Sequence, residues 1–381
     1  MGLLKLLIST TILLFLLITG CSSSIKQINV HKDLNPYSGY GRNPSREFFV
    51  NQNISDSLSL LWQNDINGGF DNSSVAIYDS LVFINDLSGR IYCFKIKNGK
   101  QVGLLKNDGA VFTTPYVYKY QVIYTAADDK ENVTHLRYYD FTKGKMKYDI
   151  EAEGRCVTEI IGTPEGIIFN TENGIVYNYD INGMEVWKTR TESVVHSSPS
   201  MKDSIIVFGN DNGEILGIDC EKGKVLYREK IGKPFFGGSS ISGNKVYIGN
   251  DDGNLYAINL HDGNIVWKYE SGARITMTPS VTSSRIYFGN LSGELFCLNK
   301  EDGSLIWKTF TEGILNATPF ASDNFLVVPD LNKKFYFVNI DNGKIEKTYF
   351  VDGRTKLSPV IFKNLLFVGY SRGELQVYEF K

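Results

Sequence analysis

The sequence repeats itself about every 40 residues, and this repeat limits the folds open to the chain more than any other feature. The recurring positions include the asparagines Asn210, Asn250 and Asn290, the glycines Gly183, Gly223, Gly263, Gly303 and Gly343, and the prolines Pro199, Pro279, Pro319 and Pro359. A period of this size is typical of a repeat architecture, in which each unit is completed by its neighbours.

Within one unit, short runs of alternating residues are separated by Gly, Asn and Asp. Residues 245–249 read KVYIG, residues 254–259 read NLYAIN, and residues 264–269 read NIVWKY. Runs of this kind predict strands joined by tight turns. A further short strand precedes each set, as in TMTPSV at residues 276–281. Four strands per repeat predict the blade of a propeller.

The number of repeats and the two chain ends predict how the ring closes. Residues 61–381 accommodate about eight repeats, so we predict an all-β, eight-bladed β-propeller of four-stranded antiparallel blades. The chain ends on GELQVYEF, the third strand of its last repeat, while Trp62 near the start matches the place of Trp267 and Trp307 in their repeats. We therefore expect the N-terminal strand to join the last blade, which leaves only short edges exposed.

Two acidic, glycine-containing segments, Asn250–Gly253 and His261–Asn264, raise the alternative of a calcium site. An EF-hand loop needs oxygen ligands at its first, third and fifth positions before the glycine. Counting back from the two glycines places Ile248 and Ile258 at the first position, and neither has a side-chain oxygen. We therefore predict turns at these segments and no bound metal.

The first residues form a different kind of segment. One lysine is followed by an apolar run from Leu6 to Ile18, which predicts a secretory signal peptide over residues 1–20. The end of the run, Ile18-Thr19-Gly20-Cys21, resembles the bacterial lipobox. This resemblance implies cleavage before Cys21 and lipidation of its thiol, palmitate being among the acyl chains, and durable anchoring takes more than one chain. The alternative is an ordinary signal peptide followed by a chance cysteine.

Three segments follow from these patterns. Residues 1–20 are the predicted signal peptide, residues 21–57 a predicted tether and lead-in, and residues 58–381 the predicted propeller. The middle segment is rich in Ser, Asn and Asp and contains GYGRNPSREFF at residues 39–49.

Charge and composition limit the classes of partner and of chemistry that the chain can support. The formal net charge is -2 and no basic stripe is present, so we expect no nucleic-acid partner. We interpret Cys93, Cys156, Cys220 and Cys297 as small core residues rather than disulfide partners. The four histidines are dispersed along the chain, and no nucleophile elbow, metal triplet or phosphate loop is present.

A recurring motif carries a family resemblance. The pattern D-G-x-x-x-W, as in Asp262–Trp267 and Asp302–Trp307, resembles the pyrroloquinoline-quinone-type propeller repeat over almost all of the mature chain. Together with the lipobox, it makes the chain resemble the BamB family of outer-membrane assembly lipoproteins. The resemblance implies a lipid-anchored scaffold at the outer membrane, facing the periplasm, which binds protein partners and supports the assembly and insertion of β-barrel proteins.

The motif also resembles the repeats of quinoprotein dehydrogenases. That resemblance would imply an enzyme with adjacent cysteines, calcium ligands and a catalytic aspartate. No two cysteines are adjacent here, so we expect neither enzymatic activity nor a cofactor. A periplasmic or surface propeller that binds a sugar or quinone-type ligand stays open as the alternative function.

Three arginines are the candidate partner-binding residues. Arg274 and Arg354 stand five residues before Pro279 and Pro359, and Arg155 has the matching place in the third blade. We expect all three in loops that enter the innermost strands, at one mouth of the central channel. Guanidinium groups there would bind carboxylates of a partner in bidentate fashion. The alternative is that they are solvated loop residues.

Overall fold

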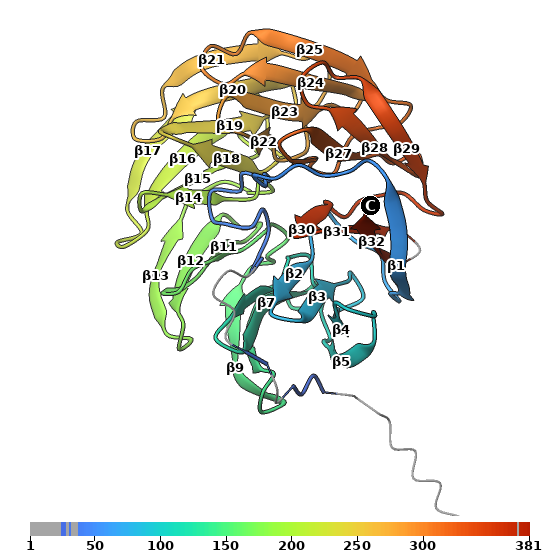
Figure 1. The fold of residues 1–381 in the computed structure, drawn as a ribbon. Helices are drawn as coiled ribbons and strands as arrows, with labels where there is room; N and C mark the ends of the chain where they lie inside the picture. The colour runs from blue at the N-terminus through green and yellow to red at the C-terminus, as the bar shows by residue number, and fades with distance from the viewer. Residues whose placement is uncertain (1–23, 28–29, 32–36, 372) are drawn as a thin grey trace, which may run out of the picture.

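The chain forms a ring of eight four-stranded antiparallel sheets (Figure 1). The structure is a computed structural model and describes residues 24–27, 30–31, 37–371 and 373–381. The predicted eight-bladed β-propeller is confirmed. Within the described ranges, no helix is long and apolar enough to cross a membrane.

The first four blades follow the chain in order, with the innermost strand first. Their strands are β2 (Ala76–Tyr78), β3 (Leu81–Asn85), β4 (Arg90–Lys95) and β5 (Gln101–Lys106); β6 (Tyr116–Tyr118), β7 (Gln121–Asp128), β8 (Val133–Asp140) and β9 (Lys145–Glu153); β10 (Ile161–Gly162), β11 (Gly166–Asn170), β12 (Ile175–Asp180) and β13 (Glu185–Arg190); and β14 (Ser200–Lys202), β15 (Ile205–Gly209), β16 (Glu214–Asp219) and β17 (Val225–Lys230).

The other four blades complete the ring. Their strands are β18 (Ser239–Ser242), β19 (Lys245–Gly249), β20 (Asn254–Asn259) and β21 (Ile265–Glu270); β22 (Ser280–Val281), β23 (Arg285–Gly289), β24 (Glu294–Asn299) and β25 (Leu305–Phe310); β26 (Phe320–Ala321), β27 (Phe325–Pro329), β28 (Lys334–Asn339) and β29 (Ile345–Phe350); and β30 (Val360–Phe362), β31 (Leu365–Tyr370), β32 (Glu374–Phe380) and β1 (Leu58–Asp65).

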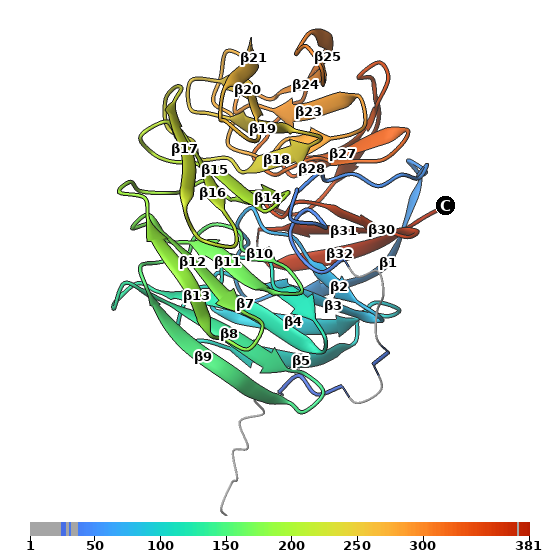
Figure 2. The same ribbon diagram turned by 90° about the vertical axis from the view of Figure 1, so that its left-hand side faces the viewer.

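The N-terminal strand completes the last blade, as predicted. β1 pairs antiparallel with β32 from Leu58–Phe380 to Asp65–Glu374, and Figure 2 shows the two strands together. The indole of Trp62 on this strand donates a hydrogen bond of 2.6 Å to the carbonyl of Ile96 in the first blade. Trp307 makes the equivalent bond, of 3.0 Å, to Ile340 in the next blade. The tryptophan repeat thus marks the outer strand and ties each such blade to its neighbour.

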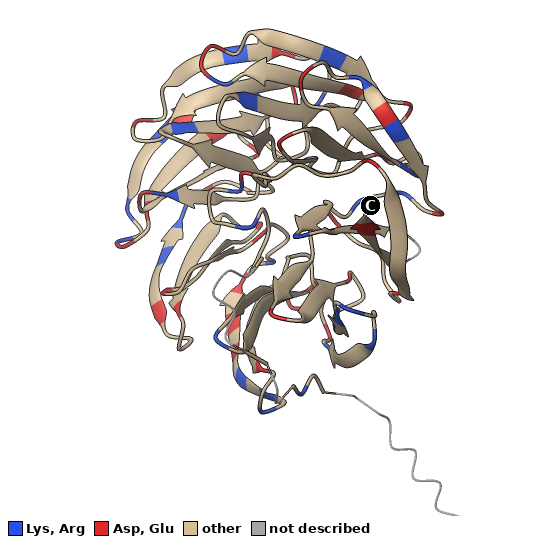
Figure 3. Ribbon diagram, viewed as in Figure 1, with Lys and Arg blue, Asp and Glu red and all other residues tan. Residues whose placement is uncertain are grey.

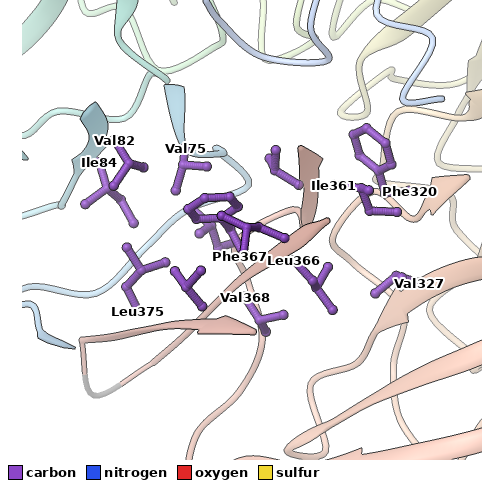
Figure 4. Close-up of a cluster of buried hydrophobic side chains, with 14 of the residues drawn as sticks. Val75, Val82, Ile84, Phe320, Val327, Ile361, Leu366, Phe367, Val368 and Leu375 are labelled. Atoms are coloured by element: carbon purple, nitrogen blue, oxygen red, sulfur yellow. The ribbon is translucent and has the colours of Figure 1, made fainter. Parts of the chain in front are cut away.

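The core lies between neighbouring blades. Figure 4 shows one such cluster, in which Phe367 and Leu366 of the last blade meet Ile84 of the first and Phe320 of the seventh. β31 is buried at every position, whereas the outer strands alternate between covered and exposed residues. The inner strands are apolar in sequence because the adjacent blades cover both of their faces.

The acidic, glycine-containing segments are turns, as predicted. The Asn250 carboxamide oxygen accepts the backbone N–H groups of Asp252 and Asn254 at 3.2 and 3.0 Å. Gly253 has a φ of 78°, a conformation that glycine adopts without steric cost. Within the part of the chain that the structure describes, no group of three or more His, Cys, Asp or Glu side chains is arranged to hold a metal ion.

Residues 37–54, which we call the plug, close one end of the central channel. Their backbone carbonyls accept hydrogen bonds from the innermost strands around the ring. These bonds join Ile77 to Tyr37, Val117 to Ser38, Met201 to Pro44, Ile241 to Ser45, Val281 to Glu47 and Ala321 to Phe48, at 2.7–2.9 Å. In Figure 1 the plug is the blue segment that crosses in front of the inner strands before β1.

The plug packs as a core element, although the sequence predicted only a tether and lead-in for residues 21–57. Phe48 is fully buried and its ring lies edge-on to Tyr40, with centroids 4.8 Å apart. Arg46 and Phe48 have φ values of 57° and 51°, so the chain turns sharply to follow the ring. Irregular backbone gives no periodic pattern, and for this reason the sequence did not indicate the packing.

Candidate functional site

The other end of the channel opens on a face that we call the open face. It consists of the loops that enter the innermost strands, such as residues 271–279, and the turns between the second and third strands, such as residues 250–253. A cavity of about 430 Å³ occupies the channel mouth. Its lining comes from the first to the seventh blade and includes Asn72, Phe112, Glu159, His196, Phe236 and Asn316.

Glu159 is a buried carboxyl group in the wall of this cavity. It is 4% exposed, and its oxygens accept the N–H and the hydroxyl of Thr114 at 2.8 and 2.9 Å. Burial raises the pKa of Glu159 to about 8, against the opposing effect of the Arg46 charge and the Thr114 bonds. The carboxyl group therefore favours its protonated form over a range in which an exposed glutamate is ionised.

Arg46 of the plug lies beneath Glu159. Its guanidinium donates to the carbonyls of Glu159 and Ile160 at 3.2 and 3.1 Å, and it stands 5.0 Å from the centre of the Tyr40 ring. Arg46 is 1% exposed, and burial lowers its pKa to about 10. The plug is thus linked through this one side chain to the wall of the open cavity.

The sequence analysis missed Glu159 and Arg46, and the repeat frame contains a signal for the first. Glu159 occupies a place where six of the other seven blades carry Ser or Thr, whose hydroxyls join neighbouring blades, and where the fifth blade carries Gly238. The members of this ring include Ser74, Thr114, Ser198, Thr278, Thr318 and Ser358, and the bonds between them include Ser74 N–H to Thr114 and Thr318 N–H to Ser358, at 2.8 and 3.3 Å. A single glutamate at a repeat position that carries a hydroxyl group in six other blades would have singled out Glu159 in the sequence.

Arg155 lies at the channel mouth, as expected, within a network of ion pairs. It contacts Asp129 at 2.8 Å and Glu172 at 3.1 Å. Glu172 also contacts the Nε2 atom of His196 at 3.1 Å, and the Nδ1 atom of His196 lies 2.8 Å from Asp211. Arg155 is therefore held by carboxylates of its own chain.

Arg274 lies further round the same rim. It forms an ion pair with Asp251, and its guanidinium stands 5.8 Å from the Phe236 ring centre. The Phe236 ring in turn stands 6.0 Å from the His196 ring. Contacts through Phe236 thus connect Arg274 to the network around Arg155.

Arg354 occupies a different setting on the open face. It lines a second pocket of about 470 Å³ with Leu291, Ile314 and Leu331, which extends from the sixth to the eighth blade. The Arg354 guanidinium is exposed, and it forms no ion pair with any carboxylate in the described part of the chain. The structure therefore places all three predicted arginines on the open face but brings only Arg155 and Arg274 into one connected network.

Two further sets of sequence predictions concern cysteines. Cys93, Cys156 and Cys297 are buried free thiols and Cys220 is a partly buried one, as expected of small core residues. Burial raises the pKa of Cys156 to about 12, so its thiol is unreactive. Cys21, the predicted lipidation site, lies outside the described residues.

The fold and the repeat motif together define a class, the pyrroloquinoline-quinone-type propellers. A sequence profile for the family described as outer membrane protein assembly factor BamB matches residues 55–172, 172–277 and 270–381. The chain belongs to this family, as its motifs predicted. No curated protein sequence matches it significantly.

Solved structures show the same fold at low sequence identity. BamB from Moraxella catarrhalis is 14% identical with a TM-score of 0.72, covering 85% of this chain and 100% of its own. The quinohemoprotein alcohol dehydrogenase ADHIIG from Pseudomonas putida HK5 is 10% identical with a TM-score of 0.78, covering 91% of this chain and 80% of its own. A europium-containing methanol dehydrogenase is 10% identical with a TM-score of 0.77, covering 91% and 98%.

The similarity to these dehydrogenases bears on the expectation that the chain has no enzymatic activity. We inferred from the missing vicinal cysteines and catalytic motifs that the chain is not an enzyme, and this inference was wrong. The same ring of blades carries alcohol and methanol dehydrogenases at TM-scores of 0.78 and 0.77, so the architecture includes enzymes as well as scaffolds. Function has to be argued from the site rather than from the fold.

The residues in the channel do not fit the quinone that such enzymes carry. Pyrroloquinoline quinone is a tricarboxylate and needs unpaired cations. The cavity instead presents the carboxylates of Asp71 and Glu172, while Arg155 and His196 are already bound to carboxylates of the chain. Like charges in a confined site repel one another, so the lining of this cavity does not suit the cofactor.

Proposed function

We propose that the chain is a lipid-anchored envelope scaffold that binds protein partners during the assembly and insertion of outer-membrane β-barrel proteins. The observation that carries the proposal is the match of the BamB family profile over residues 55–381. Membership of this family supports a role as a scaffold. The identity of the partner, the barrel-assembly machinery, is our proposal.

The rigidity of the ring supports this function. β1 and β32 close the ring, the plug ties the innermost strands together at one end, and the open face presents loops of every blade. A rigid surface binds a partner with little loss of conformational entropy. Figure 3 shows acidic and basic residues interspersed over the strands and loops in this view, which suits a protein partner better than a polyanion.

The anchor is the second part of the proposal. We propose that Cys21 carries the lipid, so that the protein stays at the outer membrane and faces the periplasm. The lipobox at Ile18–Cys21 supports this placement, and the propeller needs no membrane-spanning segment to stay there.

The rim arginines are the third part. We propose that Arg155, Arg274 and Arg354 contact carboxylates of the partner at the open face. Arg155 and Arg274 would share or exchange the carboxylates that now hold them, whereas Arg354 is free to accept one directly.

A small-ligand function is the alternative, and the channel cavity favours it. A blind cavity of about 430 Å³ has the size of a site for a small molecule. Phe112 and Phe236 offer apolar surface there, and Asn72 and Asn316 offer amides. A sugar is the class of ligand that suits such a mixture.

Purification from native envelopes tests the proposal. The lipidated protein is isolated in mild detergent and the co-purifying proteins are identified by mass spectrometry, with Cys21→Ser as the unanchored control. We expect the integral barrel-assembly protein to co-purify with the wild type above the control. Recovery of the intact propeller without that protein, or with a bound sugar, would contradict the scaffold function.

A further inference from the structure

The repeat provides an internal comparison for two of the rim arginines. Arg274 and Arg354 are 80 residues apart, which is two repeats, and so are Asp251 and Leu331. Arg274 forms an ion pair with Asp251 of the preceding blade. At the matching place Arg354 meets Leu331, with which it lines a pocket. The carboxylate that satisfies one arginine is therefore replaced by an apolar residue at the other.

The backbone confirms that the two arginines are equivalent. The N–H of Leu291 donates to the carbonyl of Arg274 at 3.0 Å, and the N–H of Ser371 donates to the carbonyl of Arg354 at 2.7 Å. The Arg354 N–H also donates to the Ser371 hydroxyl at 2.9 Å. Both loops are thus held by the same contact, and only the partner of the side chain differs.

The one carboxylate among the described residues in the lining of the second pocket is already paired elsewhere. Glu312 is the one carboxylate that lines it among the described residues, and Glu312 pairs with Lys334. Arg354 is exposed, and no ion pair joins it to a carboxylate of the described residues. A guanidinium presents a planar set of donors suited to a carboxylate.

The pocket around Arg354 combines three apolar side chains with polar ones. Leu291, Ile314 and Leu331 line the pocket, and Ile314 is 44% exposed. Phe310, next to the pocket loop, is 64% exposed, and Phe350, whose ring lies 5.3 Å from the Lys334 ammonium, is 75% exposed. Phe310 and Phe350 hold the same place in neighbouring repeats, and exposed aromatic side chains of this size are typical of interaction surfaces.

We propose that this pocket, between the sixth and eighth blades on the open face, binds a partner peptide segment in which a carboxylate stands beside a large apolar side chain. The carboxylate would pair with Arg354 while the apolar side chain enters the space among Leu291, Ile314 and Leu331. The inference rests on the proposed scaffold function and names the site and the chemistry of its partner. The carboxylate comes either from an Asp or Glu side chain or from the end of a chain.

Fluorescence anisotropy with labelled peptides tests the site. The first pair consists of Gly-Ser-Phe-Leu-Asp-Ser-Gly with an amidated end and the same peptide with Asn for Asp. The second pair ends in Phe, with a free or an amidated carboxyl group. A further peptide has Ser in place of Phe and Leu. Arg354→Gln removes the unpaired charge, and Arg274→Gln is the matched control at the paired position.

We expect the wild type to bind the acidic member of one pair about tenfold tighter than its neutral member, which is the effect of one charge-assisted pair. Arg354→Gln should abolish this difference, and Arg274→Gln should keep it. Discrimination within the first pair assigns a side-chain carboxylate, and discrimination within the second assigns a chain end. Discrimination in neither pair, or its survival in Arg354→Gln, would overturn the proposal. Equal binding of the peptide without Phe and Leu would overturn its apolar part.

The envelope experiment separates this inference from the function on which it rests. If the peptides fail while the barrel-assembly protein still co-purifies, the site is wrong and the scaffold function stands. If the peptides bind through Arg354 while no barrel-assembly protein is recovered, the site stands and the proposed partner is wrong.

Discussion

The two ends of the central channel are built from different interactions. At the closed end, backbone carbonyls of the plug accept hydrogen bonds from innermost strands, and Phe48 is fully buried. At the open end, the partly buried Arg155 and the exposed Arg274 form ion pairs along a rim. Buried packing contributes far more to stability than exposed ion pairs do. The comparison therefore assigns stability to the closed end and recognition to the open end.

Matched truncations at the two ends should show the largest difference. Phe48→Ala removes a fully buried ring, so we expect the free energy of unfolding to fall by about 3–5 kcal/mol. Phe350→Ala removes a ring that is 75% exposed, and we expect a change within about 0.5 kcal/mol. Chemical denaturation measures both. Similar losses in the two variants would remove the distinction between the ends.

The pH dependence of stability should come in part from Glu159, the buried carboxyl group in the wall of the channel cavity. Burial raises the pKa of Glu159 to about 8, above the 4.5 of an exposed glutamate, so the folded protein binds the extra proton between these values. Its contribution to stability is full below about pH 4.5 and is lost as the pH rises towards 8. A few kcal/mol are at stake at about 1.4 kcal/mol per pKa unit.

Thermal melting between pH 5 and 8.5 tests this sign. The wild type should lose more stability over the range than Glu159→Gln, which cannot ionise. The two variants would have parallel profiles if the carboxyl group were ionised throughout.

Supplying the missing carboxylate should close the second pocket. Leu331→Asp recreates the arrangement of Asp251 and Arg274, so Arg354 becomes paired within the chain. We expect the about tenfold preference for the acidic peptide to disappear while the melting temperature stays within a few degrees. An undiminished preference in this variant would mean that Arg354 does not recognise the carboxylate.

The reverse exchange should have the smallest effect. Asp251→Leu frees Arg274, and in an Arg354→Gln background it should restore about a threefold preference for the acidic peptide. The restored effect is smaller because Asp211 and Pro234 hold, two repeats earlier, the places of Leu291 and Ile314, so the surroundings of Arg274 are less apolar. Anisotropy titration of the double variant measures it, and a preference as large as that of the wild type would show that the apolar lining is irrelevant.

The repeat made much of the fold predictable from the sequence. Turn glycines such as Gly253 and the outer-strand tryptophans gave the number of strands, the blade frame and the closure by β1, because both depend on residues at fixed spacing. The plug was not predictable, because Tyr37–Ile54 follows the ring with irregular backbone and depends on carbonyls that every residue has.

The candidate site was predictable only in part. The proline frame located Arg274 and Arg354 on the correct face, but it could not tell that one is paired and the other is not. That difference depends on Asp251 and Leu331, which become neighbours of the arginines only when adjacent blades pack. Comparing the two repeats position by position would have raised the question without the structure.

The central claim is that the open face binds the partner while the closed end holds the ring together. Its most direct test compares capture of envelope proteins by the wild type and by a variant with Arg155, Arg274 and Arg354 all changed to Glu, with melting temperature as the measure of folding. We expect a folded triple variant that captures at least tenfold less of the barrel-assembly protein, because charge reversal repels the partner's carboxylates. Undiminished capture by a folded triple variant would contradict the account.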